Sequence, residues 1–382
     1  MQSLSPPSGK VAWLCTYIPE ELIRGAGFLP VRPLVAGEFA GSAGYLPANL
    51  CPCVRQTAHM LLERDMDKFE GIVLANSCNA MMHLYNLLKE DAEVPVFLLD
   101  LPRQGDNRAK EYFASRLDLM ADFLSDIGGN LSEKNLEAAI EIYMNTGEIF
   151  RDFFAGSFDD TSSIVNFLPG IIPHEFNLKA LSSKREDINA QLRDKILPKL
   201  FHEIEFVEGK AEEGKFIAEN KLCILTGSQP HSEMTEILQE NNVLTFHDHC
   251  QGYRYWQKNY SDIERGDLKS AKSREDFLNI LAAIYLDKPP CPRQYDRQDR
   301  QYDKPGTKPG RIGFYRRLLQ DLDAEGVIYH NLNFCDFAHY DYLNLQPVFE
   351  EVDLPVLNLA SELSRGDSGQ IRTRMEAFLE MI

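Results

Sequence analysis

The sequence lacks the features that mark a secreted or membrane-spanning protein. From the apolar-poor segment Met1–Lys10 we expect no signal segment, and the longest apolar runs, such as Phe277–Leu286, are too short to cross a bilayer. We therefore expect a cytoplasmic protein. Since thiols stay reduced in that compartment, the eight cysteines are expected to be metal ligands, redox groups or buried side chains, and not disulfides.

Positive charge is also scarce, because 40 Lys and Arg stand against 58 Asp and Glu, a formal net charge of −18. This balance argues against a nucleic acid or an anionic membrane surface as a partner. The sequence has no low-complexity tract, no evident repeat and no phosphate loop of the G-x-x-x-x-G-K-[ST] type. We therefore do not expect the chain to hydrolyse ATP by itself.

What is present is a regular alternation of short β-branched runs with longer amphipathic stretches, which is typical of α/β folds with parallel sheets. With 382 residues, the chain is long enough for two or three domains. We predict an N-terminal α/β lobe at residues 1–155, a helical bridge at 156–209 and a C-terminal α/β lobe at 210–382. The strands are expected at Val11–Tyr17, Phe28–Val35, Gly71–Asn76, Val94–Leu101, Lys221–Thr226, Val243–His247, Gly326–His330 and Val356–Leu359.

Helices are expected between these strands, since the intervening segments carry apolar residues at helical spacing. The segment Arg293–Pro309 is strongly charged and is expected to be an exposed loop. The predicted helices are Pro19–Gly25, Val54–Lys68, Asn79–Leu88, Asn107–Ile127, Ser132–Phe154, Pro230–Glu240, Glu275–Leu286, Ile312–Asp321, Asp336–Leu345 and a last one from Gly369.

Most cysteines lie where a predicted strand ends. Cys15 falls in the last part of the first strand, and Cys78, Cys250 and Cys335 follow other strands. Ligands of open parallel sheets bind beyond the carboxyl ends of the strands, so these thiols are placed where a ligand would be. Cys223, inside a predicted strand, is expected to be a core residue.

The remaining cysteines lie beside prolines. In LPANLCPCVRQ (Leu46–Gln56), Pro52 separates Cys51 from Cys53, and Cys291 stands between Pro290 and Pro292. A proline stiffens the turn before a helix, and a helix N-terminus favours a thiolate. Cys51 is therefore a good candidate ligand, whereas Cys53 is expected to turn away with the helix.

Four chemical interpretations of these cysteines remain open. Inert burial explains Cys223 but not the shared placement at strand ends. A structural zinc site usually shows close C-x-x-C pairs, which this sequence does not have. A nucleophilic cysteine would need a base such as His83 or His339, with no local support. Dispersed thiolates that meet across a cleft suit an iron–sulfur cluster.

Eight motifs in order over nearly the whole chain resemble the 2-hydroxyacyl-CoA dehydratase and benzoyl-CoA reductase subunit family. They are CTYIPEELIRGAG (Cys15–Gly27), YLPANLCP (Tyr45–Pro52), SCNAMMHLYN (Ser77–Asn86), FLLDLPR (Phe97–Arg103), LTGS (Leu225–Ser228), HCQGYRYW (His249–Trp256), NFCDF (Asn333–Phe337) and GQIRTRMEAFLE (Gly369–Glu380). The resemblance implies two flavodoxin-like lobes that face each other across an iron–sulfur cleft.

The resemblance further implies that Cys51, Cys78 and Cys335 hold a [4Fe–4S] cluster with one iron left open. It implies an electron supply from a separate ATP-dependent activator protein, an acyl-CoA substrate that is dehydrated or reduced by radical chemistry, and assembly with a homologous subunit or with itself. A related group, the double-cubane cluster proteins, reduces small molecules with an [8Fe–9S] cluster. In that alternative Cys15, Cys250 and Cys291 are further ligands.

The sequence NAMMH after Cys78 differs from the lysine-rich run expected of double-cubane proteins. We therefore expect the single cube, with the double cubane as the alternative. A third alternative is a non-catalytic subunit that carries the cluster or binds a catalytic homologue.

Overall fold

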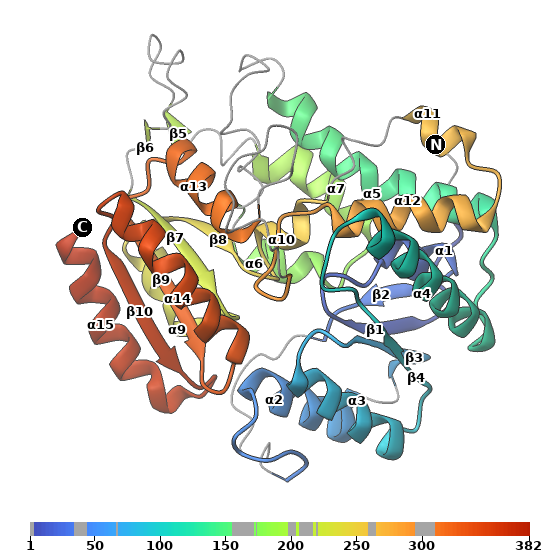
Figure 1. The fold of residues 1–382 in the computed structure, drawn as a ribbon, viewed down its shortest axis with the longest axis horizontal. Helices are drawn as coiled ribbons and strands as arrows, with labels where there is room; N and C mark the ends of the chain where they lie inside the picture. Colours follow the sequence, from blue (N-terminus) through green and yellow to red (C-terminus); the bar gives the residue numbers. More distant parts are fainter. Residues whose placement is uncertain are drawn as a thin grey trace.

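The computed structural model describes residues 4–33, 44–65, 68–154, 172, 174–197, 204–205, 217–218, 221–258, 265–294 and 310–382. These residues form two parallel four-stranded sheets, each covered by helices, and a short two-stranded antiparallel sheet of β5 (Ile204–Glu205) and β6 (Ile217–Ala218). The two large sheets lie in separate halves of the molecule (Figure 1). None of the described helices is long and apolar enough to cross a membrane.

The N-terminal sheet consists of β1 (Lys10–Leu14), β2 (Leu29–Val31), β3 (Gly71–Ala75) and β4 (Val96–Leu99) in the order β2-β1-β3-β4. The first and third strands pair in register from Val11 opposite Gly71 to Leu14 opposite Leu74. Every residue of β3 is buried, as expected for a central strand with helices on both faces.

Helices cover both faces of this sheet because successive strand residues point to opposite sides. Val11, Trp13 and Val73 lie in one apolar cluster with α1 (Glu20–Gly25), α4 (Asn107–Asp126) and α5 (Glu133–Phe154). Ala12, Leu14, Ile72 and Leu74 lie in a second cluster with α2 (Pro52–Met60), which continues as a π-helical turn (Leu61–Asp65), and with α3 (Asn79–Asp91).

The C-terminal sheet consists of β7 (Leu222–Gly227), β8 (Leu244–Asp248), β9 (Gly326–Leu332) and β10 (Val356–Ser361) in the order β10-β9-β7-β8. One face packs on α9 (Ser232–Glu240) and α15 (Ser368–Met381). The other packs on α13 (Arg311–Asp321) and α14 (Asp336–Glu351). A 3₁₀ turn, Arg365–Asp367, precedes α15.

The two sheets share one topology. Counted along the chain within each sheet, both have the strand order 2-1-3-4, which is that of flavodoxin-like folds. The predicted fold of two flavodoxin-like α/β lobes is thereby confirmed. In this topology the connections leave in opposite directions at the boundary between the first and third strands, so a crevice opens there. The boundaries lie between β1 and β3 and between β7 and β9.

Two segments join the two halves: the one after α5 and the one between β8 and β9. They contain α6 (His174–Ala180), α7 (Arg185–Gln191) with a π-helical turn (Leu192–Ile196), α10 (Tyr253–Trp256), α11 (Arg265–Ser270) and α12 (Arg274–Leu286). Although α12 lies between β8 and β9 in sequence, it packs against α4 and α5 of the N-terminal half. The predicted bounds of the two lobes and of the helical bridge stay predictions.

The predicted order of the large-sheet strands and their helices is correct, with differences at the boundaries. β1 ends at Leu14 rather than Tyr17, so Cys15 lies after the strand, and β2 covers only Leu29–Val31. α14 continues through Pro347 to Glu351. The short elements α10, α11, β5 and β6 were missed because segments this brief carry no periodicity. The predicted loop Arg293–Pro309 lies outside the described residues except for its first two.

Candidate iron–sulfur site

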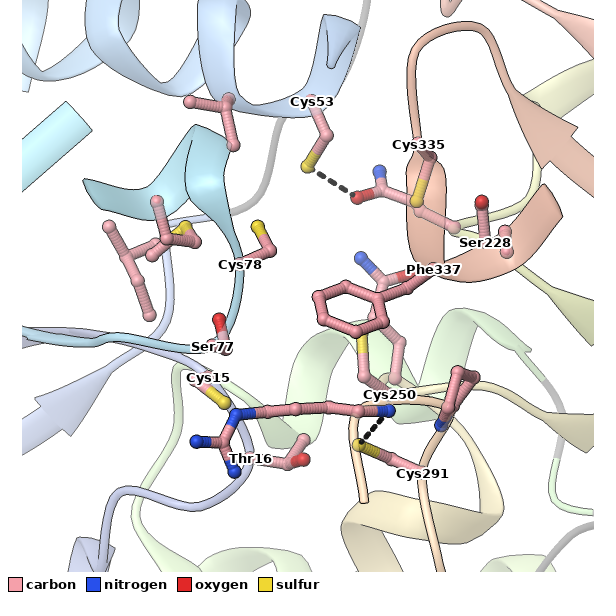
Figure 2. A pocket seen from close by; sticks show the side chains of 18 of the residues that line it. Cys15, Thr16, Cys53, Ser77, Cys78, Ser228, Cys250, Cys291, Cys335 and Phe337 are labelled. Carbon is pink, nitrogen blue, oxygen red and sulfur yellow. Dashed lines mark hydrogen bonds between the residues drawn. The ribbon is translucent and has the colours of Figure 1, made fainter. Parts of the chain in front are cut away.

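The crevices of the two lobes meet in one cavity of about 240 Å³. Cys15, Thr16, Ser77 and Cys78 line it from the ends of β1 and β3, and Gly227, Ser228, Gln229 and Cys335 line it from the ends of β7 and β9. Six of the eight cysteines, all of which are described, line this cavity: Cys15, Cys53, Cys78, Cys250, Cys291 and Cys335 (Figure 2). Figure 2 also shows the ring of Phe337 among these thiols.

Cys51, Cys78 and Cys335 share a local position. Each is the N-cap residue of a helix: Cys51 of α2, Cys78 of α3 and Cys335 of α14. Backbone amides of these first turns favour the thiolate forms, as expected from the partial positive charge of a helix N-terminus. Burial nevertheless raises the pKa of Cys78 to about 11. The sequence therefore brings three helix N-termini to one site.

Of the two cysteines of the CPC turn, Cys53 lies differently from the prediction. Cys51 is buried and is not among the residues that line the cavity. Interaction between the Cys51 and Cys335 thiols raises the pKa of Cys51 and lowers that of Cys335. Cys53 does not turn away, since its Sγ lines the cavity and lies 3.3 Å from Gln229 Oε1. The reason is that α2 already begins at Pro52, so Cys53 and Thr57 share the helix face that lines the cavity.

Cys15 occupies an unusual backbone conformation. It lies between β1 and α1 with φ of 138°, a region rarely adopted by residues other than glycine. Its carbonyl accepts a hydrogen bond of 3.0 Å from the Ile18 amide, which closes the turn. Such conformations persist where the surrounding structure enforces them, and they cluster at functional sites. Here the turn presents the Cys15 thiol at the end of its strand.

Cys250 is held by a cation from the other lobe. Arg32, which follows β2, donates to the Cys250 Sγ at 3.0 Å and to its carbonyl oxygen at 2.7 Å. Burial alone would raise the pKa of Cys250, but the adjacent Arg32 outweighs it, and the pKa is lowered. The thiolate of Cys250 is therefore favoured even though the side chain is surrounded by protein.

A buried ion network fixes the turn that carries Cys250. The Asp248 carboxylate accepts from Arg254 Nε at 2.9 Å, Arg311 Nη1 at 2.8 Å and the Tyr315 hydroxyl at 2.5 Å. Burial disfavours its charge, but the two arginines outweigh this cost and hold the pKa of Asp248 far below its ordinary value. The strand end at β8 is therefore locked in place.

The Cys291 turn also contains cations. Lys288 donates to the Thr16 carbonyl oxygen at 2.6 Å, and its Nζ lies 3.9 Å from the centre of the Tyr17 ring. Burial lowers the pKa of Lys288 to about 7. The backbone amide of Arg293 donates to Cys291 Sγ at 3.4 Å, a contact drawn in Figure 2. This end of the cavity is thus formed by residues from both lobes.

The structure bears on two of the hypotheses for the cysteines, inert burial and a zinc site. Cys223 is fully buried within β7, as predicted for a core residue. The described residues contain no group of three or more His, Cys, Asp and Glu side chains that could hold a single metal ion, which argues against a mononuclear zinc site. A cluster differs in this respect, since each thiolate binds a different iron and the sulfurs stand apart.

Sequence reasoning missed five residues that line the cavity or lie beside its lining: Tyr17, Arg32, Gln251, Lys288 and Arg293. For four of them the only local signal is proximity to a cysteine: Arg293, for example, follows Cys291 by two residues, and Gln251 follows Cys250 directly. Arg32 gave no such signal, because it meets Cys250 only through the fold.

A two-lobed α/β protein with a cysteine-lined cavity between its lobes is the class that this fold and site define. Comparison of the sequence with known families gives a more specific result. Residues 15–382 match the family described as 2-hydroxyglutaryl-CoA dehydratase, D-component, and the chain belongs to this family.

Individual relatives cover the same range. The chain is 26% identical over 373 residues to the (R)-phenyllactyl-CoA dehydratase beta subunit of Clostridium sporogenes, a match that spans 96% of this chain and 90% of the relative. It is 24% identical over 392 residues to the beta subunit of the (R)-2-hydroxyglutaryl-CoA dehydratase of Acidaminococcus fermentans, covering 98% and 93%. It is also 22% identical over 390 residues to a benzoyl-CoA reductase subunit of Thauera aromatica, covering 98% and 92%. The relatives are thus subunits of dehydratases and of a reductase.

Proposed function

We propose that this chain is the iron–sulfur subunit of an enzyme of the 2-hydroxyacyl-CoA dehydratase and benzoyl-CoA reductase type. The observation that carries the proposal is the convergence of six cysteines from both lobes on one cavity, at the crevices where flavodoxin-like sheets bind ligands. The family and the subunit names of its relatives agree with this role.

The donor set fits a cluster of iron and sulfur. Thiolates are the ligands that such clusters prefer, and the helix N-termini at Cys51, Cys78 and Cys335 supply partial positive charge for thiolates and for an anionic cluster. Apolar side chains of Val54, Met81 and Phe337 line the same cavity and limit water. When bound, such a cluster supplies single electrons of low potential.

We propose Cys51, Cys78 and Cys335 as the ligands of a [4Fe–4S] cluster. Cys51 does not line the cavity but interacts with Cys335, so a small shift of its side chain would bring it to the same cluster. A specific observation favours the double-cubane [8Fe–9S] alternative: Cys15, Cys250 and Cys291 line the same cavity as Cys78 and Cys335. Both versions place the substrate at the cavity.

The experiment is anaerobic purification followed by iron and sulfide analysis. We expect brown protein with about four irons and four sulfides per chain for a single cube, or about eight irons for a double cubane. Cys78→Ala and Cys335→Ala should lose most of the iron in both cases. Cys250→Ala should lose iron only in the second.

Cys223→Ala is the matched control, because Cys223 is a buried cysteine within β7 and does not line the cavity. It should keep its iron and lose about 1 kcal/mol of unfolding free energy through the truncation. Stoichiometric zinc without sulfide in the wild-type protein would overturn the proposal.

The proposed partners follow from the subunit role. We propose an ATP-dependent activator protein as electron donor, an acyl-CoA or other small molecule as substrate, and assembly with a homologous subunit or with a second copy. A stable homodimer that holds its cluster and turns over substrate would favour the self-sufficient enzyme. A chain that gains activity only with a homologous subunit would favour a heterodimer, in which this chain can be the cluster-carrying subunit.

A further inference from the structure

The two ends of the cavity differ in charge. Near Cys78 and Cys335 the positive potential comes from helix N-termini. Near Cys250 and Cys291 it comes from the guanidinium groups of Arg32 and Arg293, which line the cavity. An arginine stays charged at any pH at which proteins fold. The chain as a whole has a net charge of −18, so this end of the cavity is positive in a protein that is otherwise negative.

Neither cation has a carboxylate partner among the described residues. Arg32 donates to the carbonyl oxygen and sulfur of Cys250 and lies 5.4 Å from the centre of the Trp13 ring. Arg293 donates to the carbonyl oxygens of Pro102 at 2.7 Å and Leu101 at 2.6 Å. By contrast, Arg254 in the same wall is neutralised by Asp248 at 2.9 Å.

Three buried polar atoms in this wall have no hydrogen-bond partner in the described structure: the Tyr17 hydroxyl, Arg293 Nε and Gln251 Oε1. All three residues line the cavity, and they are only 1%, 6% and 1% exposed. A buried donor or acceptor without a partner destabilises the folded protein. Orphan atoms grouped at one cavity therefore point to something that binds there.

Thiolates alone do not account for this arrangement. Ionised Cys250 offsets the charge of Arg32, but it leaves Arg293 Nε unpaired. Tyr17 is a phenol, so its hydroxyl is protonated at neutral pH and can donate a hydrogen bond. Tyr17 and Arg293 line the same cavity of about 240 Å³, so one ligand bound there is near both side chains. One hydroxyl and two guanidinium groups, one of which has a free N–H donor, form a site for an oxygen anion.

We propose that the Arg32–Arg293 end of the cavity binds a small anion, either a carboxylate or an inorganic oxoanion, through Arg293 Nε, the Tyr17 hydroxyl and the charge of Arg32. Gln251 lines the same cavity, and its Oε1 can accept a hydrogen bond from a hydroxyl group on the same ligand. The inference rests on the proposed function only in treating this anion as a substrate or product; the binding itself is made by side chains of the protein.

The experiment is isothermal titration calorimetry of the protein purified without oxygen, with iron measured in the same samples, in a buffer free of other oxoanions. The carboxylate probes are lactate and acetate, with lactamide as the uncharged counterpart of lactate. The inorganic probes are phosphate and nitrate. We expect at least one anion to bind, and lactamide not to bind.

Tyr17→Phe is the decisive variant. It removes only the hydroxyl and keeps the ring that contacts Lys288, so it should leave unfolding free energy unchanged or raised while it weakens anion binding about tenfold. Arg293→Gln should weaken binding by about tenfold or more. Tyr112→Phe, at an exposed tyrosine on α4, is the matched control and should bind as the wild type does.

The outcomes separate this inference from the proposed function. Anion binding that weakens in Tyr17→Phe supports the inference, whether or not the protein contains iron, while iron-free protein would overturn the proposed function alone. Iron-containing protein that binds none of the four anions would overturn the inference. Equal binding by the wild type and both cavity variants would also overturn it.

Discussion

At the scale of single residues, position decides the chemistry of otherwise similar side chains. Cys78 is an N-cap at the cavity, whereas Cys223 is buried within a strand, where burial raises its pKa to about 12. Cys250 differs again, because Arg32 lowers its pKa. Eight identical thiols are therefore distinguished by what surrounds them.

His330 gives a residue-scale prediction about pH. It is fully buried at β9, its ring nitrogens lie 2.8 Å from the Gln229 carbonyl oxygen and from Ser361 Oγ, and burial lowers its pKa to about 4. The unfolded chain binds this proton below about pH 6.5, whereas the folded protein does so only near pH 4. The contribution of His330 to stability is thus complete above pH 6.5 and is lost as the pH falls towards 4, by up to about 3 kcal/mol.

The measurement is urea denaturation of the wild type and of His330→Gln between pH 7 and pH 4.5. The variant should lose less unfolding free energy over this range than the wild type. His83→Gln, at an exposed position on α3, should keep the wild-type slope. Identical slopes for the wild type and His330→Gln would show that folding does not lower the pKa of His330.

At the scale of elements, the site depends on how closely strand ends approach each other. Gly227 ends β7 with φ of +94°, and a Cβ there would lie 2.3 Å from the His330 carbonyl oxygen. The next amide, of Ser228, donates to the same oxygen at 2.7 Å. Glycine is therefore required where the crevice of the C-terminal sheet opens.

We predict that Gly227→Ala lowers the free energy of unfolding by at least about 2 kcal/mol, because it combines an unfavourable φ with a clash against backbone. Gly147→Ala is the control, since Gly147 lies in α5 with no atom within 4 Å of an added Cβ. That change should be neutral or stabilise by up to about 1 kcal/mol. Chemical denaturation of both variants measures the difference, and equal stabilities would contradict the requirement for glycine.

At the scale of the whole molecule, buried charges connect the two halves. Glu20 and Glu21 of α1 each lie 3.2 Å from Lys258, which follows α10 beyond the C-terminal strand β8. Tyr285 of α12 donates to Glu21 at 2.6 Å. Since Cys15 precedes α1 and Cys291 follows α12, these contacts also set how the thiols of the cavity face each other.

The whole-molecule prediction concerns the electron donor. The sequence contains no phosphate loop, so the purified chain should release no phosphate from ATP above background. Adding an ATP-dependent activator protein should be necessary for turnover, with ATP hydrolysed only in its presence. Phosphate release by the chain alone, at a rate comparable to turnover, would contradict the prediction that only the activator hydrolyses ATP.

The sequence by itself determined the α/β class, the order of the main elements and the placement of cysteines at strand ends. These properties follow from local periodicity and from turns such as Cys51–Pro52, whose effect on the backbone does not depend on distant residues. The prediction for Cys53 was wrong only because α2 begins at Pro52, two residues before the predicted start at Val54.

The tertiary structure decided everything that depends on contacts between distant segments. The two halves share the strand order 2-1-3-4 without an evident sequence repeat, because strand order is set by crossover direction and packing and not by residue identity. The contact of Arg32 with Cys250 spans 218 positions. Tyr17 and Arg293, which are also far apart in the sequence, line the same cavity only in the folded chain. No local pattern encodes such distances, so the charge of the cavity became visible only in the folded chain.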